Sequence, residues 1–220
     1  MIVAIDGPAG AGKSTIAHRV ADRLGFQLID TGALYRAVAY RALEDGLDLD
    51  SAEEVSTMAA SVHFEFRREE GENVLYCDGA RMGEKIRTGH VTRASSQISG
   101  YSAVRNSLLD VQRELGERES SVLEGRDIGT VVFPDAELKI FLTASKEVRA
   151  HRRYEQMREQ GMDADLDDVY DEIVERDRRD TERDIAPLQK ADDAVEIDTT
   201  DMEIDEVVER ILDEVEKVRK

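Results

Sequence analysis

The chain has 220 residues, of which 49 are acidic and 30 basic, so its formal net charge is −19. This balance argues against a nucleic-acid surface, and no apolar run approaches the roughly 20 residues needed to span a bilayer. The N-terminus enters a strand pattern at once, which argues against a signal peptide. The single cysteine, Cys77, cannot form an internal disulfide, which suits a reducing compartment. We therefore expect a cytoplasmic protein that binds neither nucleic acid nor membranes.

The excess of acidic residues has two possible explanations. An acidic surface keeps a protein soluble in any buffer. It also suits high salt, where the charges are screened and the surface stays hydrated. Composition alone leaves both explanations open.

A glycine-rich run near the N-terminus organises the chain: Gly7-Pro8-Ala9-Gly10-Ala11-Gly12-Lys13-Ser14. It follows Met1–Asp6, a short apolar run rich in β-branched residues, and leads into Thr15–Leu24, where apolar residues recur at helical spacing. Strand, glycine loop and helix form the context in which a G-x-x-x-x-G-K-S match indicates a phosphate-binding loop. Glycines let successive N–H groups point at one anion, and the helix start adds its positive dipole end. We expect Lys13 to reach the β- and γ-phosphates and Ser14 to ligate Mg²⁺.

The next elements alternate between strand and helix. Phe26–Asp30 reads as a strand, and Thr31 as the N-cap of a helix that continues through Leu43. Arg36 lies about one turn into that helix, so a strand end, a cap and an arginine could form a second anion site. The alternative is an ordinary exposed helix charge. A short helix is expected at Ala52–Ser61.

An antiparallel patch then interrupts the βα pattern. Apolar and polar residues alternate over Val62–Phe66 and again up to Cys77, with a turn at Glu70–Asn73 between the two stretches. A third short strand is expected at Arg81–Met82. We interpret this patch as an insertion into an α/β domain.

The chain then returns to helices at His90–Ser99 and Ala103–Gly116 and a strand at Ser121–Glu124. Arg126 and Asp127 follow this strand, at the edge where open α/β sheets bind ligands. The remaining expected elements are a strand at Leu138–Leu142, an arginine-rich helix around Arg149–Arg158, an acidic loop at Gly161–Asp168, a helix that ends at Ala186-Pro187, a strand at Ala194–Ile197 and a helix at Glu203–Val218.

The helix before Ala186 carries Arg176, Asp180 and Arg183 at positions i, i+4 and i+7, which share one face. Solvated salt bridges would explain these three residues taken alone. Together with the other arginines, they favour an enzyme that moves a phosphoryl group from one anionic substrate to another. Such a reaction requires neutralised charge on the transferring group and on both flanking phosphates.

The sequence resembles the bacterial cytidylate kinases, a family of nucleoside monophosphate kinases, over essentially its whole length. The segments that carry the resemblance are Ile5–Thr15, Asp30–Arg36, Ala94–Gln97, Gly125–Asp135, Glu175–Asp177, Asp180, Arg183 and Ala186–Leu188. The run Gly-Arg-Asp-Ile-Gly-Thr-Val-Val-x-Pro-Asp is the most specific of these. Two positions depart from the common pattern: Thr31 stands where many members have Ser, and Glu124 where some have Asp.

The resemblance implies ATP as donor, Mg²⁺ as cofactor and CMP or dCMP as acceptor, and it implies a monomer, the usual state in this family. It assigns the ATP phosphates and Mg²⁺ to Gly7 through Thr15, with Arg152 and Arg153 in a lid over ATP. It assigns the acceptor site to Thr31, Tyr35 and Arg36, with Arg36 on the CMP phosphate, and the cytosine edge to Ser96, Arg105 and Asp127. It places Arg126 beside the acceptor phosphate, and it assigns the acceptor or transferring phosphate to Arg176 and Arg183 and the sugar hydroxyls to Asp180.

Cytosine recognition also has a chemical rationale. Cytosine offers an N4 amino donor and N3 and O2 acceptors, whereas uracil reverses the polarity at two positions. Asp127 as acceptor and Arg105 as donor fit cytosine. Against uracil, polar groups would be left unpaired, at about 1–3 kcal/mol for each buried group.

Together the elements and the resemblance predict a three-layer α/β P-loop fold around a five-stranded parallel sheet with an antiparallel insertion, and the resemblance implies a helical lid. We expect a core at residues 1–31, 86–145 and 175–220, a monophosphate-binding domain at 32–85 and a lid at 146–174. The alternatives are a P-loop kinase for another small acceptor, such as another nucleotide or shikimate, and a switch module that binds ATP alone. A switch module would not need the second arginine set of Arg36, Arg126, Arg176 and Arg183.

Overall fold

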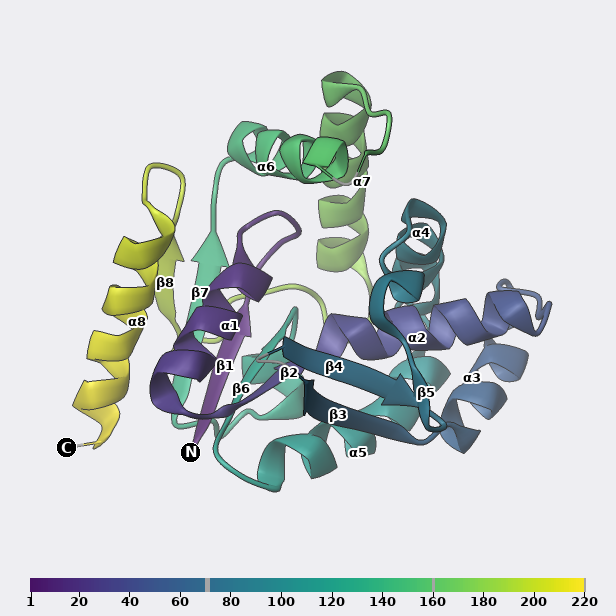
Figure 1. Ribbon diagram of the computed structural model, residues 1–220, viewed down its shortest axis with the longest axis horizontal. Coiled ribbons are helices and arrows are strands. Elements are labelled where there is room, and N and C mark those ends of the chain that lie inside the picture. Colours follow the sequence, from purple (N-terminus) through teal and green to yellow (C-terminus); the bar gives the residue numbers. More distant parts are fainter. Residues whose placement is uncertain (70–71, 160, 220) are drawn as a thin grey trace. The chain divides into compact units, whose positions relative to one another are not determined.

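The computed structural model describes residues 1–69, 72–159 and 161–219 (Figure 1). Its main sheet has the strand order β2-β6-β1-β7-β8. These strands are β1 (Ile2–Asp6), β2 (Gln27–Asp30), β6 (Ser121–Gly125), β7 (Leu138–Thr143) and β8 (Val195–Asp198). The sheet confirms the predicted five-stranded α/β core.

Parallel pairing on both sides explains why the interior of the central strand β1 is apolar. β1 pairs in parallel with β6 and β7, and β7 with β8. In β1, Val3, Ala4 and Ile5 are fully buried, as expected for a strand covered on both faces. At the carboxyl end of β1, Asp6 lies opposite Gly125 of β6. Polar residues therefore begin at the edge of the sheet where ligands bind in open α/β folds.

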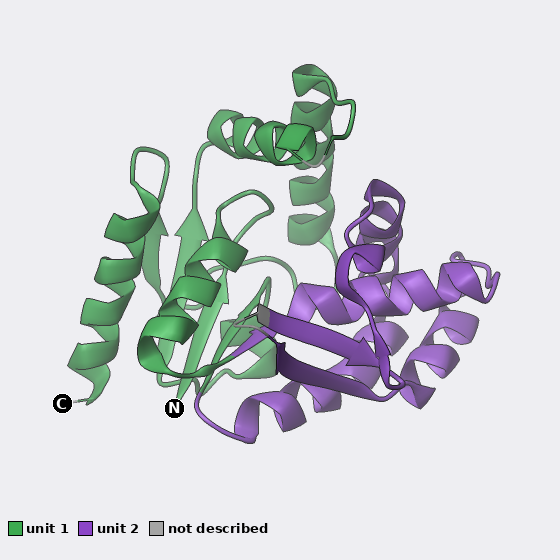
Figure 2. Ribbon diagram, viewed as in Figure 1, with its two compact units in different colours: residues 1–27, 121–220 green, residues 28–120 purple. Residues whose placement is uncertain are grey.

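The described chain divides into two compact units (Figure 2). Unit 1 comprises residues 1–27 and 121–220, and unit 2 comprises residues 28–120. Unit 1 contains a π-helical turn at Ile128–Val132 and the helices α1 (Lys13–Leu24), α6 (Lys146–Glu159), α7 (Leu166–Glu182) and α8 (Ile204–Arg219). The finer division into core, monophosphate-binding domain and lid stays a prediction.

Unit 2 combines helices with the expected antiparallel patch. The patch is a three-stranded sheet in the order β3-β4-β5, formed by β3 (Phe64–Glu69), β4 (Glu72–Cys77) and β5 (Ala80–Arg81). Part of the predicted turn, Glu70 and Gly71, lies outside the described residues. A 3₁₀ turn at Gly83–Ile86 follows, and the helices are α2 (Thr31–Glu44), α3 (Ala52–Ser61), α4 (Gly89–Ile98) and α5 (Ser102–Glu117).

Three local predictions were wrong. The N-cap of α2 is Asp30, whose carboxylate accepts the N–H of Ala33 at 2.9 Å, and Thr31 is already helical. A carboxylate one residue earlier is an equally good cap, so the sequence alone could not separate the two. α7 ends at Glu182, and Arg183 is its extended C-cap, which removes Arg183 from the helical face. The acidic loop is shorter than predicted because Asp165 caps α7 by accepting the N–H groups of Asp167 and Asp168.

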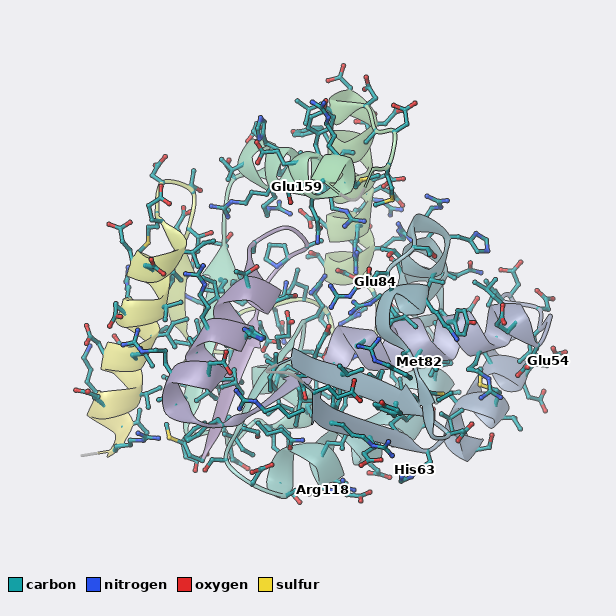
Figure 3. The ribbon with its side chains drawn as sticks, in the orientation of Figure 1. Glu54, His63, Met82, Glu84, Arg118 and Glu159 are labelled. Atoms are coloured by element: carbon teal, nitrogen blue, oxygen red, sulfur yellow. The ribbon has the colours of Figure 1, made fainter. Side chains whose placement is uncertain are left out.

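The acidic excess lies on the surface. Glu54, Glu84 and Glu159 lie on three different helical segments, and each is exposed (Figure 3). Within the described residues, no helix combines the length and the apolar character that crossing a membrane requires.

Candidate active site

The glycine loop of unit 1 packs tightly against its neighbours. Gly7 has φ 149°, and a Cβ there would lie 2.0 Å from the carbonyl oxygen of Leu142 in β7. Gly10 has φ 78°, and its Cβ would meet Arg149 of α6 at 2.9 Å. Both glycines are thus required by left-handed backbone and by close approach. The loop is held in a defined shape at the amino end of α1.

That end of α1 is suited to an anion. Gly12 is the N-cap, no side chain caps the helix, and its first turn has no acidic residue. Lys13 is buried and its Nζ donates to the carbonyl oxygen of Pro8 at 2.7 Å. Burial is the main cause that lowers the pKa of Lys13, and the positive charges of Arg126 and Arg176 lower it further. A bound polyphosphate would offset this repulsion, since it brings negative charge to the cluster.

Ser14, at the end of the loop, has a hydroxyl oxygen of the kind that hard cations prefer as a ligand. Its hydroxyl donates to Oε2 of Glu124 at 2.9 Å, and Glu124 is a buried residue of β6. A hydroxyl and a carboxylate at the start of a phosphate-binding helix are ligand types that Mg²⁺ accepts, directly or through its waters. The residues present therefore fit a magnesium ion.

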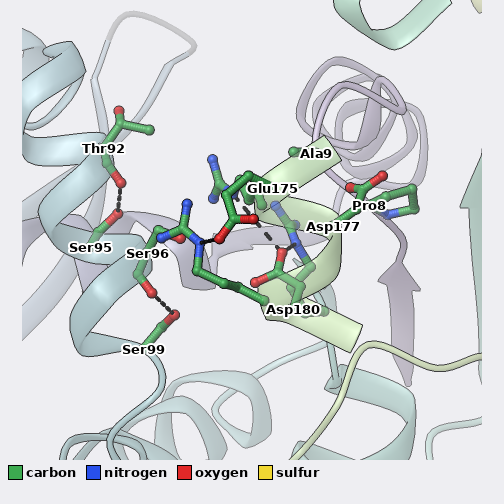
Figure 4. A network of polar contacts seen from close by, with 12 residues as sticks. Pro8, Ala9, Thr92, Ser95, Ser96, Ser99, Glu175, Asp177 and Asp180 are labelled. Atoms are coloured by element: carbon green, nitrogen blue, oxygen red, sulfur yellow. Dashed lines mark hydrogen bonds and ion pairs between the residues drawn. The ribbon is translucent and has the colours of Figure 1, made fainter. Parts of the chain in front are cut away.

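A second group of charges is centred on Asp180 of α7. Its Oδ2 accepts from Nε of Arg126 at 2.9 Å and lies 4.0 Å from Nε of Arg176. Burial would raise the pKa of Asp180, but the guanidinium groups of Arg126 and Arg176 outweigh it and hold that pKa below its usual value. Figure 4 shows Asp177 and Asp180 on the same helix, near Pro8 and Ala9 of the glycine loop. Unit 1 therefore brings together the loop and two of the predicted arginines.

Arg183 and Asp127 form a third contact in unit 1. Nη2 of Arg183 lies 3.4 Å from Oδ1 of Asp127, and its Nε donates to the carbonyl oxygen of Ala186 at 2.6 Å. The side chains of both partners are nearly buried. Arg183 thus lies with the other predicted phosphate ligands although it is not on the helix that carries them.

Unit 2 positions its own predicted residues on three helices. Arg36 donates to Oδ2 of Asp30 at 2.7 Å, and the guanidinium lies over Gly32, where a Cβ would approach Nη1 to 3.0 Å. The guanidinium of Arg105 lies 5.6 Å from the ring centroid of Tyr35, which is a cation–π contact. α2 carries Thr31, Tyr35 and Arg36, and α5 carries Arg105.

Ser96 of α4 stands out in unit 2. Its hydroxyl oxygen is buried and has no hydrogen-bond partner among the described residues. Its carbonyl oxygen accepts from the hydroxyl of Ser99 at 2.9 Å (Figure 4). A buried hydroxyl without a partner is uncommon, and a ligand that offers a hydrogen bond would satisfy it.

The arginine-rich helix α6 uses its arginines in different ways. Arg152 donates to Oγ1 and to the carbonyl oxygen of Thr199, at 3.0 and 2.7 Å. Thr199 Oγ1 lies 3.4 Å from the carbonyl oxygen of Ala11, so Arg152 is linked to the glycine loop. Arg153 donates to Gln156 of its own helix.

Three residues without a predicted role are important in the structure. Asp6 accepts two backbone N–H groups, Asp30 holds Arg36, and Arg149 makes a bidentate ion pair with Asp177. Asp6 and Asp30 each end a strand of the main sheet, which is a signal that the sequence did contain. Arg149 had no such signal, because its partners are 28 and 140 residues away.

Comparison with known proteins gives the family. A family model described as cytidylate kinase matches residues 3–217. Cytidylate kinases from Bacillus thuringiensis (strain Al Hakam) and Bacillus anthracis (strain CDC 684 / NRRL 3495) are each 45% identical over 210 residues, covering 96% of this chain and 93% of theirs. The solved structure of an uncharacterized protein from Eubacterium ventriosum ATCC 27560 has a TM-score of 0.53 at 13% identity and covers 98% of both chains, a likeness of fold.

Proposed function

The chain belongs to the cytidylate kinase family, and on that premise we propose which of its residues transfer the γ-phosphoryl group of ATP to CMP or dCMP. The observation that carries the proposal is the cluster of buried Lys13 with the half-buried Arg126 and Arg176 near the amino end of α1, balanced by buried Glu124 and Asp180. Such a cluster is complementary to a transferring phosphoryl group.

The donor phosphates bind to the glycine loop. Backbone N–H groups of the segment Gly7–Thr15, apart from Pro8, which has none, surround them, and Lys13 neutralises the β- and γ-phosphates once its bond to the Pro8 carbonyl oxygen is exchanged for the anion. Arg152 and Arg153 of α6 belong to the lid over ATP. Ser14 would hold Mg²⁺, and Glu124 would accept hydrogen bonds from water on the ion, which when bound would supply positive charge to the donor phosphates.

Acceptor-binding residues are proposed within each unit separately. In unit 2, Arg36 binds the CMP phosphate, Thr31 and Tyr35 line the nucleotide, and Ser96 and Arg105 read the cytosine edge. In unit 1, Arg126, Arg176 and Arg183 bind the acceptor or transferring phosphate and Asp180 contacts the sugar hydroxyls. Support comes from the partners of these residues, since Asp30, Asp127 and Asp180 hold the arginines in place in the absence of substrate.

The reaction needs little covalent chemistry from the protein. The attacking oxygen belongs to the acceptor phosphate and is already anionic, so no separate general base is required. The protein aligns donor and acceptor and neutralises the charge on the transferring group. Lys13, Arg126, Arg176 and Arg183 supply that charge. We expect this enzyme to work as a monomer in the cytoplasm.

Substrate choice is tested by coupled ADP release with CMP, dCMP, UMP, AMP and GMP. We expect CMP and dCMP to be phosphorylated with the highest kcat/KM. Asp127→Ala should raise the CMP KM and lower the CMP/UMP ratio of kcat/KM by about 5–150-fold, because an acceptor for N4 is lost, at roughly 1–3 kcal/mol. Asp192→Ala, which removes an exposed carboxylate of the same unit, is the control. An unchanged ratio in Asp127→Ala would show that Asp127 does not read the base.

A further inference from the structure

The carboxylate of Asp6 is buried at the carboxyl end of β1, directly before the glycine loop. It accepts the backbone N–H of Ile128 at 2.8 Å and that of Gly129 at 2.7 Å. These residues open the π-helical turn that follows Arg126 and Asp127, and they are more than 120 residues away in the sequence. Asp6 therefore caps this turn from another strand.

Asp127 occupies the position from which a side chain would ordinarily cap the turn. Its backbone has φ −145° and ψ 26°, and its own side chain makes no capping hydrogen bond. Its carbonyl oxygen accepts from Val131 at 2.9 Å, while its carboxylate is directed to Arg183. Because Asp6 binds the first N–H groups of the turn, the carboxylate of Asp127 does not have to cap it.

The fit around this cap is close. A Cβ on Gly129 would lie 3.4 Å from Oδ2 of Asp6 and 3.1 Å from Cδ of Lys139. Opposite Asp6 in the sheet is Gly125, the residue before Arg126. The chain from Gly125 to Gly129 is thus held to the end of β1 at both ends, by the sheet register and by the two hydrogen bonds.

We propose that Asp6 is a positioning residue of the phosphoryl transfer, which fixes the Gly125–Gly129 turn so that Arg126 meets the phosphate and Asp127 meets the base. The role rests on the proposed function for its effect on catalysis. The hydrogen bonds from Asp6 to the turn do not depend on catalysis, so their effect on the turn can be tested without substrate. Asp6 directly precedes the donor loop, but its carboxylate bonds to the turn that reads the acceptor. Its loss should therefore weaken binding of the acceptor and leave binding of the donor unchanged.

The test is Asp6→Asn, which keeps the size of the side chain but replaces one accepting oxygen with an NH₂ group that faces an N–H donor. We expect the CMP KM to rise about tenfold or more while the ATP KM stays within about threefold, and the CMP/UMP selectivity to fall. Amide hydrogen exchange at Ile128 and Gly129 should be faster in the variant without substrate. The control is Glu137→Gln, at a carboxylate that accepts the N–H of Ile2 at the opposite end of β1, and it should change none of these values.

A purely structural role for Asp6 would lower the melting temperature without moving the CMP KM or the selectivity in the folded variant, and that result overturns the proposal. If Asp6→Asn does not fold, Asp6→Glu keeps the carboxylate but lengthens the side chain by one methylene, which displaces the accepting oxygens from the two N–H groups. It should raise the CMP KM and speed exchange at Ile128, and unchanged values there overturn the proposal as well. If the unmodified protein does not phosphorylate CMP, the proposed function fails, and the exchange rates still decide whether Asp6 holds the turn: equal protection in both proteins refutes it.

Discussion

Removing the carboxylate of Asp177 should destabilise unit 1 through Arg149. The guanidinium of Arg149 is 3% exposed, and it lies within 2.6 and 3.0 Å of the two carboxylate oxygens of Asp177. It also donates to the carbonyl oxygens of Ala9 and Ala144 at 3.0 Å. Asp177→Asn keeps the shape of the side chain and leaves a buried cation without its counter-charge.

The expected loss is about 3–5 kcal/mol in the free energy of unfolding, the range for breaking a buried ion pair by removing one partner. For a chain of this size, each kcal/mol lowers the melting temperature by about 2–4 °C, so we expect a fall of roughly 6–20 °C. Replacing both partners, as in Arg149→Met with Asp177→Leu, should recover most of the loss, because no charge then remains buried.

Thermal and urea unfolding of the single and double variants measure these differences. Asp171→Asn, which changes an exposed carboxylate of the same helix, is the control and should stay within about 0.5 kcal/mol of the unmodified protein. The loss in Asp177→Asn should persist in high salt, since buried pairs are screened little. A loss below about 1 kcal/mol, or a double variant as unstable as the single one, would refute the assignment of a buried, mutually dependent pair.

Three further predictions concern catalysis, pH and salt. Lys13→Ala should lower kcat by more than about 10³-fold in a folded protein, because the phosphoryl group loses its charge partner. The control Lys146→Ala, at an exposed lysine, should leave kcat unchanged. Activity of Lys13→Ala within about tenfold of the unmodified protein would contradict the glycine-loop assignment. Burial raises the pKa of Asp6 to about 6 from 3.8, against the hydrogen bonds from Gly129 and Ile128. Between these two pH values the Asp6 carboxyl is protonated in the folded state and ionised in the unfolded state. The contribution of this protonation to stability is therefore complete below pH 3.8 and is lost as the pH rises through 6. Between about pH 4 and pH 7 the free energy of unfolding of Asp6→Asn should thus rise relative to that of the unmodified protein, by up to about 3 kcal/mol. If the two proteins lose stability in parallel over this pH range, the pKa of Asp6 is not raised. Because salt screens the repulsion among the acidic groups, the net charge of −19 predicts that the melting temperature rises by several degrees between about 0.05 M and about 2 M KCl, with CMP phosphorylation retained. A constant melting temperature together with loss of activity above about 1 M KCl would leave solubility as the reason for the acidic composition.

Much of the fold could be predicted because its signals are local. The apolar run Met1–Asp6, the glycines of the loop and the helical periodicity of Thr15–Leu24 follow one another along the chain. The structure has a strand, a loop and a helix in that order, with β1 at Ile2–Asp6 and α1 at Lys13–Leu24. The antiparallel patch was predicted from the change of period after Val62, and β3, β4 and β5 lie within a few residues of the expected positions. The boundaries that failed all lie at helix ends: Asp30 caps α2 in place of Thr31, α7 begins inside the expected acidic loop, and α7 ends before Arg183.

The sequence by itself determined the glycine loop, the order of strands and helices and, through the resemblance, the family and the residues assigned to substrate. Only the tertiary structure decided which charges meet: Arg126 with Asp180, Arg149 with Asp177, and Asp6 with the N–H groups of Ile128 and Gly129. The physical reason is that these contacts join residues 28 to 123 positions apart, so they depend on sheet register and on the packing of α6 and α7. A hydrogen bond or ion pair forms only within about 3–4 Å, and no local pattern of residue types encodes so short a distance across so long a chain.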